Sequence, residues 1–397
     1  MKRKSALVLA AVLLCTLLTS CDSGSYSRSE VVLGDAIVLR ISASGAKSKT
    51  ATDGMFALAD EVFGDMDLSN DTSVLSRFNA SKTTDAFEID EHIFAVLELS
   101  AAACELSSGA FDITSYPLSK LWRVDTEGLH GLRPDPFDPV GTATDSLPDI
   151  AEVKETLKHV GMDKIDFFEE EGKYYLKKLD PETQIDLGGI AKGYFADKCV
   201  EKAKEYGLKS CLIDLSGNLY LYGKGIKGGG DWSVGIADPR PRLEIEEFRG
   251  YVAAVKSGGN RSYVTCGDYQ RFYYCDLSGS AASEDDLIAV CHVIDPRNGL
   301  PVGISYSESG GYTAAGGAVC MSVVSGGASA MCDALSTAVT VLGIDEGARL
   351  LENSDFDGLI FTSPSLGSSK GKLAVVGEWE FISGYDGYSS DYERQNA

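Results

Sequence analysis

The stretch QIDLGGIAKGYFADK, from Gln184 to Lys198, joins an acidic residue, two adjacent glycines and a lysine over a short distance. Its apolar start ends near Ile185, Gly188 and Gly189 follow, and a helical pattern then continues. This order predicts a strand, a tight turn and a helix. Glycines at such a turn let the backbone approach a ligand closely, and a helix N-terminus favours phosphate through its partial positive charge.

Two polar side chains of this stretch are candidate ligand contacts. Asp186, just before the turn, can accept hydrogen bonds from a ring or a ribose, and Lys192 lies where a cation can face a diphosphate. The spacing matches neither GxGxxG nor GxxxxGKS/T, so the common dinucleotide and P-loop fingerprints do not apply. Taken alone, the stretch is equally consistent with a tight turn beside an N-capping aspartate.

Strand-like and helical patterns alternate outward from this stretch. Short apolar runs such as AIVLRIS, KYYLKKL and YVAAVKSGG read as strands. Helical patterns cover residues 51–64, 90–107, 149–159, 191–206 and 330–342. The mixture predicts an α+β fold with antiparallel hairpins and crossover helices. The segment 305–330, rich in glycine, serine and alanine, suggests either a flexible lid or an insertion at the surface.

A second candidate site lies in MCDALSTAVTVLG, residues 331–343. Asp333 and Thr337 are four residues apart and therefore share one helix face, with Ser336 beside them. Carboxylates, hydroxyls and backbone carbonyls are the hard oxygen ligands that suit Mg²⁺. The alternative interpretation is that Asp333 caps the helix and that the hydroxyls are ordinary residues of an amphipathic helix.

His292, one of four histidines, stands at the end of a short strand in CHVIDPRNGLP, residues 291–301. The DPRNG that follows is a turn sequence. Close to the two sites above, His292 could act as a general base for the attack of a hydroxyl on a phosphate. The alternative is a packed or solvated bystander, because spacing along the chain does not place this residue in a site.

The N-terminal residues have the features of an export signal. Three basic residues precede the apolar run ALVLAAVLLCTLL, which is short for a permanent membrane helix. The sequence LTSC at residues 18–21 then matches a lipoprotein processing site. We therefore expect a signal peptide over residues 1–20, a lipid on Cys21, a tether over residues 21–29 and one domain over residues 30–397. An ordinary cleaved signal is the alternative.

The chain is strongly acidic, with a formal net charge of −23 that becomes −26 once the three basic residues of the signal are removed. Such a surface repels the phosphates of nucleic acids, so we expect no nucleic-acid partner. A phosphorylated ligand held by a few local cations or by a metal remains compatible with this charge. Eight of the ten cysteines belong to the folded part, and this even number would permit disulfides outside the cytoplasm. No CxxC spacing occurs, and the sequence does not indicate which cysteines would pair.

Together these motifs resemble the ApbE family of FAD:protein FMN transferases, which are often exported lipoproteins. The segments that occur in the family's order are TSVLSRFN, GAFDITSYPLSKLW, IDLGGIAKGY, LIDLSGNLYLYG, TCGDYQRFY, HVIDPRNGLP and CDALSTAVTVLG. The resemblance extends from about Val31 to about Phe381. Several motifs in one order are more specific than any one of them.

The resemblance implies a T-fold-like α+β architecture of mixed and antiparallel sheets with helices, which holds FAD in a cleft between lobes with Mg²⁺ at the diphosphate. FMN would pass to a threonine hydroxyl of another exported protein, with release of AMP. His292 would be the base, and Gly189 would offer its carbonyl to the metal. Carried over in the same way, FAD contacts would be Ala110, Phe111, Asp112, Asp186, Lys192, Ile294, Leu33 and Ser69, and the other metal ligands would be Asp333, Ser336 and Thr337.

The chain departs from the family pattern at several of these positions. Leu33 stands where methionine is usual, and Cys266 stands where serine is usual. Ser69 or Leu68 falls where relatives often carry a tyrosine that covers the flavin. Ser336 occupies a place where some relatives have a metal-binding aspartate.

The resemblance also implies the setting in which the protein works. The expected acceptor carries a threonine flavinylation motif, as in Rnf-type or sodium-pumping NADH:quinone oxidoreductases or exported flavin reductases. The expected location is the outer face of the cytoplasmic membrane, through the lipid on Cys21.

Two alternative functions would use the same residues. One is a Mg²⁺-dependent FAD diphosphatase that uses water and yields FMN and AMP, and the other is a flavin-binding lipoprotein without chemistry.

Overall fold

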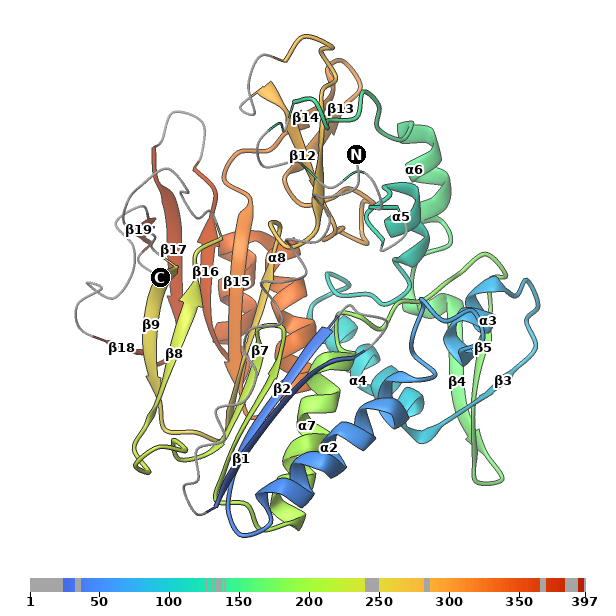
Figure 1. Cartoon of the computed structure of the whole chain (residues 1–397). Helices are drawn as coiled ribbons and strands as arrows, with labels where there is room; N and C mark the ends of the chain where they lie inside the picture. The colour runs from blue at the N-terminus through green and yellow to red at the C-terminus, as the bar shows by residue number, and fades with distance from the viewer. Residues whose placement is uncertain are drawn as a thin grey trace, which may run out of the picture.

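The computed structural model describes residues 24–395 except 33–36, 126–127, 130–131, 133, 135–137, 139, 240–249, 282–285, 365–368 and 383–391. The predicted signal peptide, Cys21 and Leu33 lie outside the described residues. The remainder has the predicted α+β architecture, with mixed and antiparallel sheets and covering helices (Figure 1). Within the described ranges, no helix combines the length and the apolar character that a membrane span requires.

A nine-stranded sheet forms the centre of the fold, in the order β1-β2-β6-β7-β10-β15-β16-β17-β19. Neighbouring strands are antiparallel, except that β17 and β19 pair in parallel. The strands are β1 (Ser25–Val32), β2 (Ile37–Ser44), β6 (Ser210–Leu215), β7 (Asn218–Gly223), β10 (Arg261–Gly267), β15 (Val319–Gly326), β16 (Asp357–Thr362), β17 (Gly371–Val376) and β19 (Tyr392–Arg394).

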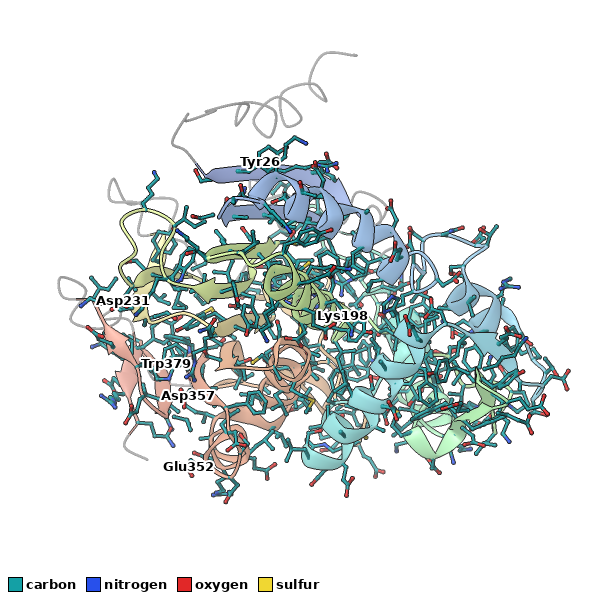
Figure 2. The ribbon with its side chains drawn as sticks, turned by 90° about the horizontal axis from the view of Figure 1, so that it is seen from below. Tyr26, Lys198, Asp231, Glu352, Asp357 and Trp379 are labelled. Atoms are coloured by element: carbon teal, nitrogen blue, oxygen red, sulfur yellow. The ribbon has the colours of Figure 1, made fainter. Side chains whose placement is uncertain are left out.

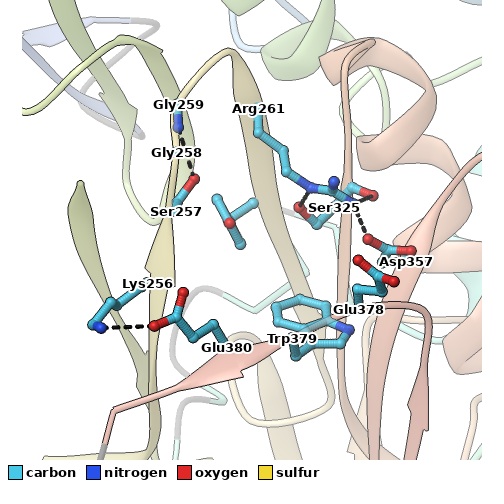
Figure 3. Close-up of a pocket in the computed structure, with 11 residues that line it drawn as sticks. Lys256, Ser257, Gly258, Gly259, Arg261, Ser325, Asp357, Glu378, Trp379 and Glu380 are labelled. Carbon is cyan, nitrogen blue, oxygen red and sulfur yellow. Dashed lines mark hydrogen bonds and ion pairs between the residues drawn. The ribbon is translucent and has the colours of Figure 1, made fainter.

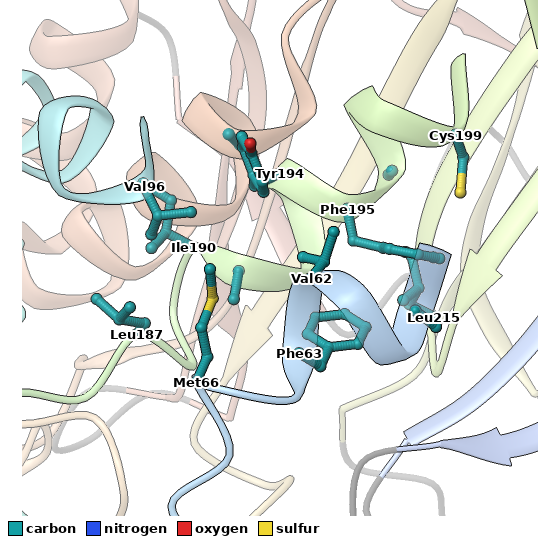
Figure 4. Packing of buried hydrophobic residues seen from close by; sticks show 14 of the residues in the cluster. Val62, Phe63, Met66, Val96, Leu187, Ile190, Tyr194, Phe195, Cys199 and Leu215 are labelled. Atoms are coloured by element: carbon teal, nitrogen blue, oxygen red, sulfur yellow. The ribbon is translucent and has the colours of Figure 1, made fainter. Parts of the chain in front are cut away.

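Helices cover one face of this sheet, and they match the predicted helical patterns. They include α2 (Ser48–Phe63), α4 (Glu91–Leu106), α7 (Ala191–Glu205) and α8 (Ser329–Glu352). α2 contacts β1 and β2, α7 contacts β6 and β7, and α8 contacts β10, β15 and β16. Buried side chains of α7 such as Phe195 pack against Phe63 of α2 (Figure 4). α8 extends beyond its predicted end because it continues past a kink at Gly343, whose φ is 84°.

A three-stranded sheet covers part of the opposite face. Its order is β18-β9-β8, with β8 (Trp232–Ala237), β9 (Tyr251–Ser257) and β18 (Glu380–Phe381). Val323 of β15 packs in the cluster that includes this small sheet, whereas the next residue, Val324, packs against α8. Successive side chains of a strand point to opposite faces, so the large sheet is the middle of three layers.

Shorter elements complete the fold. A third sheet has the order β3-β5-β4, with β3 (Phe87–Ile89), β4 (Ile165–Glu170) and β5 (Lys173–Lys178), and α3 (Val74–Ala80) lies beside it. A separate cluster is built around Trp122, whose indole N–H donates to the carbonyl of Gly299 at 2.8 Å. Its elements are α5 (Tyr116–Leu121), α6 (Ile150–Leu157), β11 (Phe272–Cys275), β12 (Ile288–Cys291), β13 (Ile304–Ser307) and β14 (Gly311–Ala314).

Two of the sequence predictions are wrong in detail. Residues 25–29, predicted as part of a tether, form the start of β1 and pair with β2. The segment 305–330 is not a surface lid or insertion throughout, because residues 319–326 form β15, which is buried along its whole length between β10 and β16. Serine suits this strand because α8 lies close to it: the hydroxyl of Ser322 donates to the carbonyl of Ser336 at 2.7 Å.

The crossing of α7 and α8 positions the residues that the sequence analysis singled out. A Cβ atom on Gly193 of α7 would lie 2.3 Å from the carbonyl oxygen of Ser329 at the start of α8. Asp197 of α7 accepts hydrogen bonds from the amides of Ser329 at 2.8 Å and Ala330 at 2.9 Å, so it caps α8. Burial raises the pKa of Asp197 to about 6. The first turns of both helices are therefore held together.

Replacing Gly193 with alanine should destabilise the protein, because the added methyl group meets the backbone of α8, which has little freedom to move. We expect a loss of roughly 1–3 kcal/mol in the free energy of unfolding, measured by denaturant titration. Gly230→Ala is the matched control, since a Cβ there meets nothing within 4 Å and Gly230 has no positive φ. Equal losses in both variants would contradict this account of the helix crossing.

Candidate active site

The loop that leads into α7 is folded by its own side chains. The Asp186 carboxylate accepts a hydrogen bond from the amide of Gly188 at 2.7 Å, and the Lys192 ammonium donates to the carbonyl of Gly188 at 3.0 Å. α7 starts after Ile190 without a capping side chain. The predicted turn and helix are confirmed, whereas the predicted strand is reduced to a single bridge at Gln184. Asp186 closes the turn and does not cap α7.

Asn79 and Lys178 hold this loop in place, Asn79 by direct hydrogen bonds and Lys178 through Asn79. The sequence analysis did not identify either residue. The side-chain amide of Asn79 pairs with both the N–H and the C=O of Ile185, each at 2.8 Å. The ammonium of buried Lys178 donates to the carbonyls of Asn79 at 3.3 Å and Ser81 at 2.7 Å. Burial lowers the pKa of Lys178 to about 8. Asn79 is 106 positions away from Ile185, so no local pattern could reveal the contact.

Asp333 lies in the first turns of α8 and faces the start of α7. Its Oδ2 accepts from the amide of Gly193 at 2.9 Å, and its Oδ1 accepts from the side chain of Asn218 at 2.9 Å. Lys192 Nζ lies 3.9 Å from the same Oδ1. Because Asp197 caps α8, the capping alternative for Asp333 is wrong, and its carboxylate instead joins α7, α8 and β7. Asn218 at the start of β7 was not predicted.

Thr337 and Ser336 differ in where their hydroxyls point. A Cβ atom built on Gly189 would lie 3.7 Å from Thr337 Oγ1, so Thr337 stands beside the loop. Its hydroxyl lies 3.9 Å from the sulfur of Cys266, which is a weak acceptor. The hydroxyl of Ser336 is buried and donates to the carbonyl of Asp333 at 2.7 Å. Thr337 is therefore placed to bind a ligand at the loop, and Ser336 is engaged within its own helix.

His292 is held in one tautomer by Arg271, which the sequence analysis did not single out. Its backbone N–H donates to the carbonyl of Arg271 at 3.0 Å, and its Nδ1 lies 3.2 Å from the same oxygen. A carbonyl oxygen only accepts, so Nδ1 carries the proton and Nε2 keeps its lone pair. Surrounding protein lowers the pKa of His292 well below its ordinary value, and the charges of Arg271 and Lys192 lower it further. The neutral imidazole is thus a base at neutral pH.

Packing and electrostatics both connect these groups. Thr337 lies beside Cys266, and Cys266 packs with Cys291 and Val293, the residues on either side of His292. The charge of Lys192 lowers the pKa of His292 and also counteracts the rise that burial causes in the pKa of Cys266. The charge of Asp333 raises the pKa of Cys266. The structure therefore brings together the loop before α7, the first half of α8, the end of β10 and His292.

Only part of the predicted FAD-contacting segment 110–112 lies against the loop before α7. Ala110 and Phe111 are buried, and a Cβ atom on Gly189 would lie 3.1 Å from the Phe111 ring. The Asp112 carboxylate is engaged elsewhere: it accepts from the amide and hydroxyl of Thr114 at 2.8 Å and 2.6 Å. Burial raises the pKa of Asp112. Phe111 thus touches the loop, and Asp112 organises its own turn.

The contacts of Ile294 and Ser69 are with parts of the chain other than the loop before α7. Ile294 is buried in the cluster around Trp122 and forms a bridge with Pro301. Ser69 is exposed, and its amide and hydroxyl donate to the carboxylate of Asp67 at 2.8 Å and 2.7 Å. Their predicted contacts with FAD stay predictions.

The oxygen atoms that α8 and the loop before α7 provide suit a divalent cation that takes its remaining ligands from a phosphate group. Within the described ranges, no group of three or more histidine, cysteine, aspartate or glutamate side chains is close enough to form an all-protein metal cage. Asp333, Thr337 and the backbone of Gly189 instead provide a carboxylate, a hydroxyl and a carbonyl in one place. Mg²⁺ typically keeps several waters and takes oxygen ligands from substrate phosphates. These residues could therefore hold Mg²⁺ without further protein ligands.

Comparison with known proteins shows the family of the chain. The model of the ApbE family matches residues 33–360. The chain belongs to the ApbE family. It is 28% identical over 368 residues to the FAD:protein FMN transferase of Treponema pallidum, with 86% of each chain covered. It is 26% identical over 311 residues to the FAD:protein FMN transferase of Haemophilus influenzae, with 78% of each chain covered.

Solved ApbE structures share the fold. The flavin transferase ApbE from Vibrio cholerae superimposes with a TM-score of 0.65 at 22% identity, and covers 92% of this chain and 100% of its own. The apo form of the Pseudomonas stutzeri flavinyl transferase ApbE has a TM-score of 0.64 at 20% identity, and covers 90% of this chain and 94% of its own. The α+β fold is therefore the ApbE architecture.

His292 should titrate well below pH 6.5, since burial and two nearby cations favour its neutral form. Lys192→Met removes one of these charges and should raise the pKa of His292. Lys198→Met, on the same helix, removes a lysine that pairs with Glu201 and should leave this pKa unchanged. NMR titration of the histidine ring carbons in the three proteins provides the measurement. A His292 pKa at or above 6.5 in the unsubstituted protein would contradict the proposed environment.

Proposed function

We propose that this ApbE-family protein transfers FMN from FAD to a threonine hydroxyl of an exported acceptor protein, with Mg²⁺ as cofactor and AMP as the second product. One observation carries the proposal: a neutral histidine, a lysine and an oxygen ligand set converge at the loop before α7. A cation and hard oxygen ligands suit a diphosphate, and a neutral base suits a hydroxyl nucleophile. The names of the curated relatives support the same reaction.

Lys192 and the loop account for binding of the diphosphate. The ammonium of Lys192 sits between the carbonyl of Gly188 and the carboxylate of Asp333, so its position is set by the protein before substrate binds. Charges fixed in advance stabilise a phosphoryl transition state without reorganisation. Asp186 is only partly buried, and one of its oxygens keeps hydrogen-bonding capacity for FAD after the turn is closed.

His292 accounts for activation of the acceptor hydroxyl. Its Nε2 accepts the threonine proton as the threonine oxygen bonds to the phosphorus of the FMN half. The bond from that phosphorus to the AMP oxygen breaks, and AMP leaves with the electron pair. A positioned base contributes about 10²–10⁴-fold to such a reaction. The carbonyl of Arg271 maintains the required tautomer throughout.

Asp333, Thr337 and Gly189 would hold Mg²⁺. When bound, the ion supplies positive charge that offsets the negative charge developing on the diphosphate. Asn218 and the amide of Gly193 orient the Asp333 carboxylate through one hydrogen bond to each oxygen. Each carboxylate oxygen keeps further acceptor capacity after its hydrogen bond, as ligation of a metal requires.

The leader sequence supports export and lipid attachment at Cys21, and hence work at the outer face of the cytoplasmic membrane. The acceptors that fit such a location are membrane redox complexes of the Rnf or sodium-pumping NADH:quinone oxidoreductase type and exported flavin reductases. Each of these acceptors would have to present a threonine to His292 on an extended segment.

Incubation of the protein with FAD, Mg²⁺ and an acceptor containing a Ser-Gly-Ala-Thr sequence should add the mass of one FMN to that threonine. Intact-mass spectrometry of the acceptor, with chromatography of the nucleotides, measures both products. EDTA should abolish the modification. Release of FMN and AMP with an unmodified acceptor would favour the diphosphatase, and unchanged FAD would favour a binding protein without chemistry.

Thr337→Val should lower turnover by roughly two or more orders of magnitude, the scale seen when an electrostatic contact to a transition state is lost. Ser336→Ala is the matched control and should retain turnover near that of the unsubstituted protein, because its hydroxyl is engaged by the carbonyl of Asp333. The Mg²⁺-dependent rise in melting temperature provides a readout without catalysis, and it should be lost in Thr337→Val alone. Loss of both properties in Ser336→Ala would show that the metal is held differently.

A further inference from the structure

A cavity of about 490 Å³ lies on the far side of the large sheet from α8 (Figure 3). It is formed where β9, β10, β16 and β18 meet, and every residue that lines it belongs to the described part of the chain. In Figure 2, Asp357 and Trp379 of this cavity lie away from Lys198 of α7. Arg261 begins β10 and Cys266 is near its other end, so the cavity is roughly 17 Å along the strand from the candidate active site.

An indole ring forms one wall of this cavity. The N–H of Trp379 donates to the carbonyl of Val376 at 2.9 Å, which orients the ring and satisfies its one polar group. Tyr263 meets the indole edge to face, with ring centroids 5.9 Å apart and planes at 65°. Trp379 is partly exposed and lines the cavity. A rigid, accessible indole face attracts cations through the negative face of its π system.

The charged side chains around this ring leave one carboxylate available. Arg261 is paired with Asp357, and its Nε also donates to the hydroxyl of Ser325 at 2.7 Å. Lys256 is paired with Glu380 at 2.6 Å. Glu378 is exposed and forms no ion pair with any residue that the structure describes. The lining therefore carries one negative charge in excess, and that charge belongs to the residue next to Trp379.

The turn between β9 and β10 lines the cavity with two glycines, Gly258 and Gly259. A Cβ atom on Gly259 would lie 1.9 Å from the carbonyl oxygen of Gly223, and Gly259 has a φ of 90°, so other residues are strained at this position. At these two positions the turn therefore presents only backbone to a ligand.

We propose that this cavity binds an alkylammonium group, with the cation over the face of Trp379 and its charge balanced by Glu378. An alkylammonium ion joins a single positive charge to apolar carbon, which matches an aromatic wall beside one unpaired carboxylate. An anion would meet the excess negative charge of the lining, and a purely apolar ligand would leave Glu378 without a partner. The proposal is independent of flavin transfer, since none of the residues named for that reaction lines the cavity.

Choline and its neutral carbon isostere, 3,3-dimethyl-1-butanol, test the charge directly, because they share a shape and differ in charge. Saturation-transfer NMR of their methyl signals in the presence of the whole protein should show saturable binding of choline in the millimolar range and little binding of the isostere. Nα-acetyl-lysine N-methylamide tests a primary ammonium. If it binds more tightly than choline, hydrogen bonding to Glu378 dominates, and if choline binds more tightly, the indole face dominates. Either result supports the proposal.

Glu378→Gln and Trp379→Leu should each weaken choline binding by about tenfold. Glu378 is exposed and Trp379 is partly buried, so the far-UV circular dichroism spectrum of each variant checks that it is folded. Glu170→Gln, an exposed carboxylate in the separate sheet that contains β4, is the matched control and should have no effect. Equal binding of choline and the isostere, unchanged binding in both variants, or tighter binding of a neutral sugar such as glucose would overturn the proposal.

Discussion

The close approach of α7 and α8 is the constraint on which the candidate active site depends. Gly193 has no room for a side chain against Ser329, and this proximity lets the amide of Gly193 reach the carboxylate of Asp333. Asp197 fixes the same crossing from α7 by capping α8. The loop before α7, which carries Lys192, and the helix face that carries Thr337 are thereby set opposite each other. A side chain at Gly193 would separate the loop before α7 from Asp333 and Thr337 of α8.

Electrostatics in this region is arranged around a small number of fixed charges. The protein as a whole has a formal net charge of −23, which opposes binding of an anionic dinucleotide. Lys192 and Arg271 offset that field locally, and their charges also favour the neutral form of His292. Burial is the main cause that lowers the pKa of His292, and the same cations that would attract a diphosphate lower it further.

Helices and turns with strong local signals were predicted well. The patterns at residues 90–107 and 191–206 match α4 and α7 to within a residue at each end, because their periodicity and termini are local properties. The segment 305–330 was misinterpreted because its small residues resemble a loop, although residues 319–326 form a short, mostly apolar run that is consistent with a fully buried strand. Its small side chains are explained by the nearness of α8, which no local pattern contains.

Local sequence patterns were enough to predict the α+β class, the turn at Gly188 and Gly189, the placement of Asp333 and Thr337 on one helix face, and the resemblance to the ApbE family. These follow from short-range spacing and from the order of motifs. Other features became visible only in the folded chain. The hydroxyl of Ser336 and the carboxylate of Asp112 are engaged by nearby groups. Asn79 positions the loop before α7, Asn218 positions Asp333, and Arg271 sets the tautomer of His292. Hydrogen bonds such as that between Asn79 and Ile185, 106 positions apart, exist only once the chain has folded, because packing chooses which of many polar groups meet.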